Sequence, residues 1–211
     1  MQNEIMKKVE EIKLVPVVKL DRVEDALPLG EALLKGGLPV AEVTFRTDAA
    51  EESIRRMIRE FPDMCVGAGT VINTEQAKRA VDAGAAFLVS PGCSRAIIEY
   101  GQSAGVAVFP GVCTPTEIMT VLEYGLDVVK FFPAKQYGGL DTIKALAAPF
   151  PALRFMPTGG VNAANMMEYL SFPKIIAVGG SWMVKDALIK EGKFDEIARL
   201  TAEAVGLIRT L

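Results

Sequence analysis

The chain has 211 residues, with 23 Lys and Arg against 26 Asp and Glu, no histidine and three cysteines. A net charge of −3 without a basic block argues against electrostatic binding of nucleic acid. No apolar run reaches the roughly 20 residues that a membrane-spanning helix needs, and the polar start Met1–Glu4 shows no apolar signal segment. We therefore expect a cytoplasmic globular protein, with one domain over residues 1–211 and no membrane or nucleic-acid partner.

The missing histidine restricts the possible chemistry. Without it the chain cannot form a Ser-His-Asp triad, a Cys-His dyad or an imidazole zinc site, so proton transfer must come from Glu, Asp, Lys, Tyr or Cys. Cys65, Cys93 and Cys113 are odd in number and lack metal-ligand spacing, and we interpret them as small core residues. Gly67-Ala68-Gly69 lacks the third glycine of a dinucleotide fingerprint. We predict no metal and no cofactor.

Short apolar runs recur along the chain at a regular interval. From the start of the first to the start of the last there are 161 residues in seven intervals, or 23 per unit, which indicates a repeated supersecondary unit. The eight runs, each predicted to be a strand, are Leu14–Val18, Val40–Thr44, Cys65–Gly67, Phe87–Ser90, Val106–Phe109, Val128–Phe131, Leu153–Met156 and Ile175–Val178.

Helical patterns separate the runs. One has apolar residues at i, i+3, i+4 and i+7, namely Ile54, Met57, Ile58 and Phe61. Thr114–Glu117 has the pattern of a capping box with proline at the first helical position. Asn73, Ser94 and Asn162 are further predicted helix starts.

Strands that alternate with helices predict an α/β fold with a parallel sheet covered on its outside. A closed eight-stranded barrel and an open doubly wound sheet both fit this pattern. Eight regular units without a glycine-rich dinucleotide turn favour a (β/α)8 TIM barrel, with an extra N-terminal helix at Glu4–Ile12.

Lys130 stands out within the apolar run Val128–Pro133. Because side chains alternate along a strand, Lys130 shares a face with Val128 and Phe132. Such a lysine either extends its ammonium to solvent or is a desolvated amine. Burial disfavours the charged form, and a neutral amine can attack a carbonyl to form a Schiff base.

The second predicted strand places polar residues on one face. Glu42, Thr44 and Arg46 share a parity, and Ala41, Val43 and Phe45 share the other. Strands of parallel barrels are normally apolar on both faces, which disfavours the alternative of a solvated alternating strand. We expect Glu42 to shuttle protons and Arg46 to bind a substrate carboxylate. Glu42 alone would favour a charged Lys130, whereas Arg46 would offset that effect.

Two Gly-Gly pairs follow the last two predicted strands. Gly159-Gly160 comes after Thr158, and Gly179-Gly180 comes before Ser181 and a predicted short helix. In (β/α)8 barrels the loops after strands seven and eight commonly hold a phosphate, and glycine lets backbone N–H groups approach the anion. Either Gly-Gly pair alone is weak evidence, but the two together predict a phosphate site.

The sequence resembles the class I KDPG/KHG aldolase family over nearly its whole length. The resemblance is carried by Glu42–Thr47, Gly67–Thr70, Ser90–Gly92, Lys130–Ala134, Pro157–Gly160 and Gly179–Trp182. It implies that Lys130 forms the Schiff base, that Glu42 is the general acid and base, and that Thr158 favours the gluconate over the galactonate epimer. It implies further binding residues: Arg46 and Thr70 for the pyruvyl carboxylate, Pro91 and Phe132 for the pyruvyl pocket, and Gly159, Gly160, Gly180 and Ser181 for the phosphate.

The resemblance implies a homotrimer that cleaves a phosphorylated keto acid, 2-dehydro-3-deoxy-6-phosphogluconate, to pyruvate and glyceraldehyde 3-phosphate. The nearest alternatives are cleavage of 4-hydroxy-2-oxoglutarate or of the galactonate epimer. From other classes, a phosphosugar isomerase or a non-catalytic phosphate-binding module would use the same phosphate site.

Overall fold

The computed structural model describes residues 2–210 as strands that alternate with helices. The strands are β1 (Leu14–Val18), β2 (Val40–Thr44), β3 (Cys65–Gly69), β4 (Phe87–Val89), β5 (Ala107–Phe109), β6 (Gly111–Val112), β7 (Val128–Phe131), β8 (Arg154–Pro157) and β9 (Val178–Gly180). The helices are α1 (Gln2–Ile12), the 3-10 turn η1 (Val23–Asp25), α2 (Ala26–Lys35), α3 (Ala50–Glu60), α4 (Thr74–Asp82), α5 (Arg95–Ser103), α6 (Pro115–Glu123), α7 (Gly139–Ala147), α8 (Met166–Leu170), α9 (Asp186–Lys190) and α10 (Phe194–Ile208).

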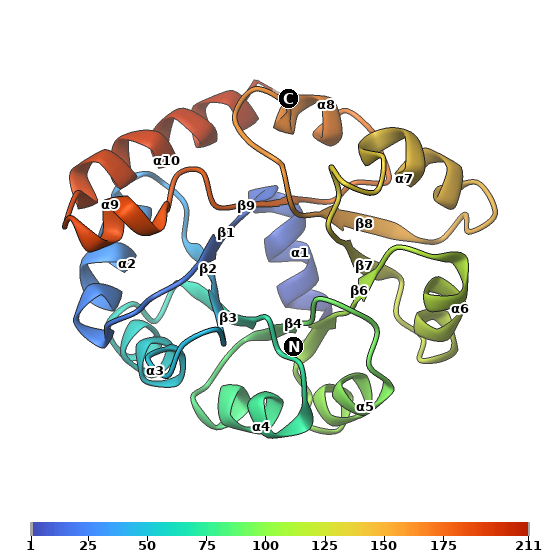
Figure 1. The fold of residues 1–211 in the computed structure, drawn as a ribbon, viewed down its shortest axis with the longest axis horizontal. Coiled ribbons are helices and arrows are strands. Elements are labelled where there is room, and N and C mark those ends of the chain that lie inside the picture. The colour runs from blue at the N-terminus through green and yellow to red at the C-terminus, as the bar shows by residue number, and fades with distance from the viewer. Residues whose placement is uncertain (1, 211) are drawn as a thin grey trace.

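The strands pair in parallel throughout the described chain. Six of them form one sheet in the order β5-β4-β3-β2-β1-β9, and three form a second in the order β6-β7-β8. In Figure 1 the strands occupy the middle of the molecule, helices α2 to α10 surround them, and α1 lies at the centre of the view. The protein therefore has the predicted α/β fold with a parallel sheet, helices outside and an additional N-terminal helix.

Short links connect the two sheets. Pro110 separates β5 from β6, and since proline has no N–H it interrupts the strand ladder at this point. At the other side, isolated parallel bridges join Phe155 to Ile175 and Thr158 to Gly179, and so connect β8 to the segment that leads into β9. The two sheets are thus linked through Pro110 and through these two bridges.

The strands are buried on both faces, as parallel strands covered by helices must be. All residues of β2 and β3 are buried. Four strands each contribute a fully buried phenylalanine: Phe87, Phe109, Phe131 and Phe155. The rings of Phe87 and Phe109 meet edge to face with centroids 5.7 Å apart. Gly67 provides the room, because a Cβ there would lie 2.3 Å from the Phe87 ring.

Several predicted helix signals are confirmed. The Thr114 side chain accepts a hydrogen bond from the Glu117 N–H while the Glu117 carboxylate accepts one from the Thr114 N–H, so the capping box of α6 is complete. Asn73 and Ser94 cap α4 and α5 through their side chains. Within residues 2–210 no helix combines the length and the apolar character that crossing a membrane requires.

The last predicted strand and one predicted helix start are displaced. Seven predicted strands lie within two residues of their expected bounds, but β9 begins at Val178, and Ile175 makes an isolated bridge instead. The buried apolar run before Val178 packs into the core with only this single bridge to β8 and does not form a continuous strand. Asn162 lies in a turn, where its side chain accepts the Ala164 N–H, and α8 begins only at Met166.

Candidate active site

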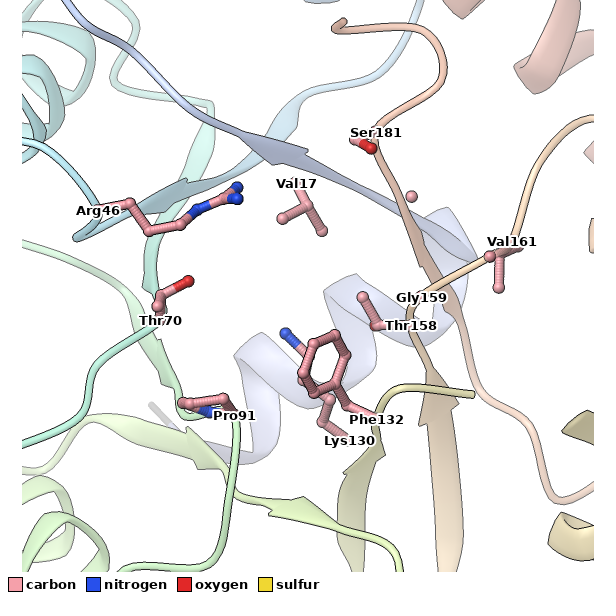
Figure 2. A pocket seen from close by; sticks show the side chains of 12 residues that line it. Val17, Arg46, Thr70, Pro91, Lys130, Phe132, Thr158, Gly159, Val161 and Ser181 are labelled. Carbon is pink, nitrogen blue, oxygen red and sulfur yellow. The ribbon is translucent and has the colours of Figure 1, made fainter. Parts of the chain in front are cut away.

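A cavity of about 360 Å³ opens at the carboxyl ends of the strands, where parallel α/β folds usually place their ligands. Its wall comes from strand ends and from the loops that follow them (Figure 2). The lining residues are Val17, Arg46, Thr70, Pro91, Lys130, Phe132, Thr158, Gly159, Gly160, Val161, Gly180 and Ser181.

The structure brings together every predicted site residue. All of them line the cavity except Glu42, which is fully buried beneath it in β2. Val17 and Val161 also line the cavity and were not predicted. Val17 could have been found, because it lies near the carboxyl end of the first predicted strand, Leu14–Val18, where this fold places its ligands.

Lys130 and Glu42 form a buried pair at the floor of the cavity. The Lys130 Nζ lies 3.3 Å from Glu42 Oε1, and the two side chains are 6% and 0% exposed. Lys130 Nζ also lies 5.2 Å from the centroid of the Phe132 ring, and Figure 2 shows the amine directed into the cavity. Glu42 Oε2 is buried and has no hydrogen-bond partner among the described residues. A carboxylate oxygen is therefore available beside the amine for a water molecule or a substrate proton.

Gly69 makes the room for this pair. It lies opposite Thr44 in the neighbouring strand, and a Cβ at position 69 would stand 2.2 Å from Glu42 Oε1. Together with Gly67, which faces the Phe87 ring, it explains the Gly-Ala-Gly sequence of β3. This motif serves side-chain packing and does not form a nucleotide-binding turn.

Arg46 is oriented by the strand that precedes it. Its Nε donates to Thr44 Oγ1 at 3.1 Å, and the buried Thr44 hydroxyl donates to the Val18 carbonyl oxygen at 2.8 Å. The terminal guanidinium nitrogens point into the cavity above Thr70, whose hydroxyl also faces inward (Figure 2). A guanidinium beside a hydroxyl suits a carboxylate, which accepts paired hydrogen bonds.

The opposite wall is rich in glycine. Gly159 and Gly160 have φ angles of 98° and 79°, which favour glycine. Thr158 is buried, and its Oγ1 has no hydrogen-bond partner among the described residues. Gly179 leaves space for this atom, because a Cβ there would lie 2.3 Å from it. The predicted short helix after Ser181 begins only at Asp186, so the loop itself presents the backbone of Gly180 and Ser181 to the cavity.

The cysteines take no part in this site. Cys65 is buried, and burial raises the pKa of its thiol to about 11. Cys93 and Cys113 are half-buried rather than core residues, and burial followed by the Glu117 carboxylate raises the pKa of each. Among residues 2–210 no three His, Cys, Asp or Glu side chains come close enough together to hold a metal ion.

A buried amine beside a carboxylate, with a cationic side chain on one wall and a glycine-rich loop on the other, defines an α/β protein suited to carbonyl chemistry on an anionic molecule. A family model for KDPG and KHG aldolases matches residues 5–200. The chain belongs to this aldolase family.

Individual relatives agree over nearly the full chain. The 2-dehydro-3-deoxy-phosphogluconate aldolase of Treponema pallidum is 44% identical over 204 residues, 97% of each chain. The KHG/KDPG aldolase of Escherichia coli K12 is 40% identical over 192 residues, 91% of this chain and 90% of that protein. A crystal structure of the KDPG aldolase from Legionella pneumophila, with pyruvate captured as a covalent carbinolamine, is 40% identical with a TM-score of 0.91, covering 97% of this chain and 98% of that one.

Proposed function

We propose that the protein is a class I aldolase that cleaves 2-dehydro-3-deoxy-6-phosphogluconate to pyruvate and glyceraldehyde 3-phosphate. The observation that carries this proposal is the buried pair of Lys130 and Glu42, 3.3 Å apart, on the floor of a cavity with Arg46 on its wall. The names of the relatives supply the substrate class. The pair supplies a nucleophilic amine and a proton carrier in contact with it.

The reaction begins when the Lys130 amine attacks the C2 ketone of the substrate. By then Glu42 has taken a proton from the Lys130 ammonium, and it relays a second proton from the nitrogen to the oxygen of the carbinolamine. It then gives the first proton to the carbinolamine hydroxyl, which leaves as water and produces a protonated imine. A base, Glu42 acting through a water molecule, then takes the proton of the C4 hydroxyl. The C3–C4 bond breaks, its electron pair moves toward the imine nitrogen, and glyceraldehyde 3-phosphate leaves. Protonation at C3 and hydrolysis of the imine release pyruvate and restore the amine.

The remaining cavity residues bind the two charged ends of the substrate. In this proposal Arg46 and Thr70 hold the carboxylate, and Pro91 and Phe132 form the walls around the pyruvyl group. The phosphate is held at the glycine-rich wall by backbone N–H groups and a hydroxyl, from Gly159, Gly160, Gly180 and Ser181. Such backbone sites suit a phosphate dianion because each N–H donates to it without a competing acceptor.

Two related substrates remain as candidates. Cleavage of 4-hydroxy-2-oxoglutarate needs the pyruvyl half of the site and no phosphate, and the name of the Escherichia coli relative favours it as a second activity. Thr158, with its unpartnered hydroxyl in the cavity wall, is proposed to favour the gluconate over the galactonate epimer.

The proposal extends to architecture. The strand segments on either side of Pro110 and the Thr158–Gly179 bridge support one domain with a closed (β/α)8 barrel. Ile72 and Met119 are 61% and 58% exposed and are candidate contact residues of a homotrimer. Light scattering of the purified protein would measure its mass and so test whether it is a trimer.

The phosphorylated substrate is charged and does not cross a lipid bilayer unaided, which favours a cytoplasmic location.

The test combines imine trapping with product analysis. Borohydride in the presence of pyruvate should reduce a Lys130 imine to a stable adduct, seen by mass spectrometry of the digested protein. A phosphosugar isomerase or a phosphate-binding module would give no adduct. Pyruvate release from each of the three substrates then ranks the activities. Absence of the adduct, or an adduct at another lysine, would contradict the proposal.

A further inference from the structure

Gln76, in the first turn of α4, lies behind the two loops that carry Arg46 and Thr70. Its Oε1 accepts a hydrogen bond from the Ile72 N–H at 3.0 Å, and its Nε2 makes a longer contact of 3.5 Å with the Phe45 carbonyl oxygen. Because an N–H can only donate, the contact with Ile72 fixes which way the amide points. One side chain therefore connects the loop after β3 with the loop after β2.

The loop after β3 needs such support. Thr70 has a φ of 54°, in the left-handed region that a β-branched residue rarely adopts. This conformation costs free energy and persists only where surrounding contacts hold it. The Val71 N–H donates to the Val89 carbonyl at 3.1 Å, and the Ile72 N–H donates to Gln76, so two successive hydrogen bonds fix the chain directly after Thr70.

In the loop after β2, Phe45, the residue before Arg46, makes several contacts that hold the chain in place. Its N–H donates to the Gly69 carbonyl at 2.8 Å, and its ring lies 5.7 Å below the guanidinium carbon of Arg79. Arg79 is itself paired with Glu51 at 2.7 Å. The contact between Gln76 and the Phe45 carbonyl adds a side-chain link from this segment to the chain that follows Thr70.

We propose that Gln76 is a positioning residue, which holds Arg46 and Thr70 at the spacing that a substrate carboxylate requires. This inference rests on the proposed function, since it assumes that the two residues bind the pyruvyl carboxylate. Gln76 is not among the residues that line the cavity, and its hydrogen bonds in the described chain go to Ile72, Asn73 and Phe45 rather than to Lys130 or Glu42. Its loss should therefore weaken binding of the carboxylate and leave the reactivity of the amine unchanged.

The experiment measures borohydride trapping across a range of pyruvate concentrations. Gln76→Leu removes both hydrogen bonds and should raise the half-saturating pyruvate concentration about five- to thirtyfold, with the maximal trapping rate changed less than about twofold. Gln76→Glu keeps an acceptor for the Ile72 N–H and loses the donor to Phe45, so it should give a smaller rise. The matched control is Gln102→Leu, which removes a side-chain bond of 2.8 Å to the Tyr124 carbonyl outside the cavity lining.

A double variant separates positioning from general destabilisation. In an Arg46→Met background, Gln76→Leu should add less than about twofold to the half-saturating concentration, because the residue that it positions is already gone. Three results would overturn the proposal. The first is that the effects of Gln76→Leu and Arg46→Met on the half-saturating concentration are fully additive. The others are an equal rise of that concentration in Gln102→Leu, or a lower maximal trapping rate at an unchanged half-saturating concentration in Gln76→Leu. If Gln76→Leu fails to fold, Gln76→Glu alone carries the test, and unchanged half-saturation there refutes it. Failure of the wild-type protein to trap pyruvate would instead overturn the proposed function.

Discussion

Substitution of Gly69 by alanine tests whether catalysis depends on the position of Glu42. An added Cβ would stand 2.2 Å from Glu42 Oε1 and 2.6 Å from its Cγ, whereas carbon–oxygen contacts are normally about 3.4 Å or longer. The carboxylate must therefore move by about 1 Å. Oε1 is also the carboxylate atom that lies 3.3 Å from the Lys130 Nζ, so the substitution disturbs the contact between the two groups.

A displacement of this size at a proton-transferring group costs about a hundredfold in kcat. The same crowding should lower the free energy of unfolding by about 1–3 kcal/mol, as overpacking of a core usually does. We would measure pyruvate release from the phosphorylated substrate under steady-state conditions, together with the free energy of unfolding in urea.

Gly67→Ala is the matched control for this variant. Its Cβ would stand 2.3 Å from the Phe87 ring, so the crowding is equal, in the same strand, and away from the carboxylate. It should lose similar stability and keep kcat within about threefold. Equal losses of kcat in both variants would refute the reasoning, as would wild-type kcat in Gly69→Ala.

Two further predictions concern the cavity rim and the start of α6. Ser181→Asp should lower kcat/KM for the phosphorylated substrate about thirty- to a thousandfold, because like charges repel in a partly desolvated loop. The rate of pyruvate trapping should change little in this variant. Equal losses of kcat/KM and of the trapping rate would refute the placement of the phosphate. For Glu117, burial would raise the pKa, but hydrogen bonds from Cys113 and Thr114 lower it overall. The stabilisation by this carboxylate is therefore complete above its unfolded pKa and is lost as the pH falls. In urea unfolding, Glu117→Gln should lose about 1 kcal/mol less free energy of unfolding on acidification than wild type. Equal losses in the two proteins would refute this prediction.

The side-chain chemistry of the site was predictable because it contrasts with its surroundings. A lysine and a glutamate in strands that must be buried on both faces are conspicuous, and strand parity alone places Glu42, Thr44 and Arg46 together. The structure confirms that these residues meet at one end of the sheet, with Glu42 and Thr44 fully buried and Arg46 exposed at the cavity. The roles assigned to them remain predictions.

Backbone conformation and room between strands were not predictable from residue type. Thr70 has a left-handed φ, which threonine does not favour, and the hydrogen bonds of Val71 and Ile72 that follow it are visible only in the structure. The need for glycine at position 69 appears only when the register with β2 is known.

The buried pair of Lys130 and Glu42 should cost stability as well as provide chemistry. Both side chains are almost fully buried, and Glu42 Oε2 has no partner in the described chain, so the desolvation of two charges is only partly repaid. Lys130→Met should abolish cleavage and pyruvate labelling, and should lower the free energy of unfolding by about 3–5 kcal/mol because it leaves a buried carboxylate unpaired.

Adding Glu42→Leu to that variant removes both charges and should restore the free energy of unfolding to the wild-type value or exceed it by about 1–4 kcal/mol. Urea unfolding of the wild type, both single variants and the double variant would measure this coupling. A double variant that stays less stable than wild type would mean that the pair stabilises the fold. If the double variant regains the wild-type free energy of unfolding but has no activity, the Lys130–Glu42 pair is maintained for its chemistry at the expense of stability.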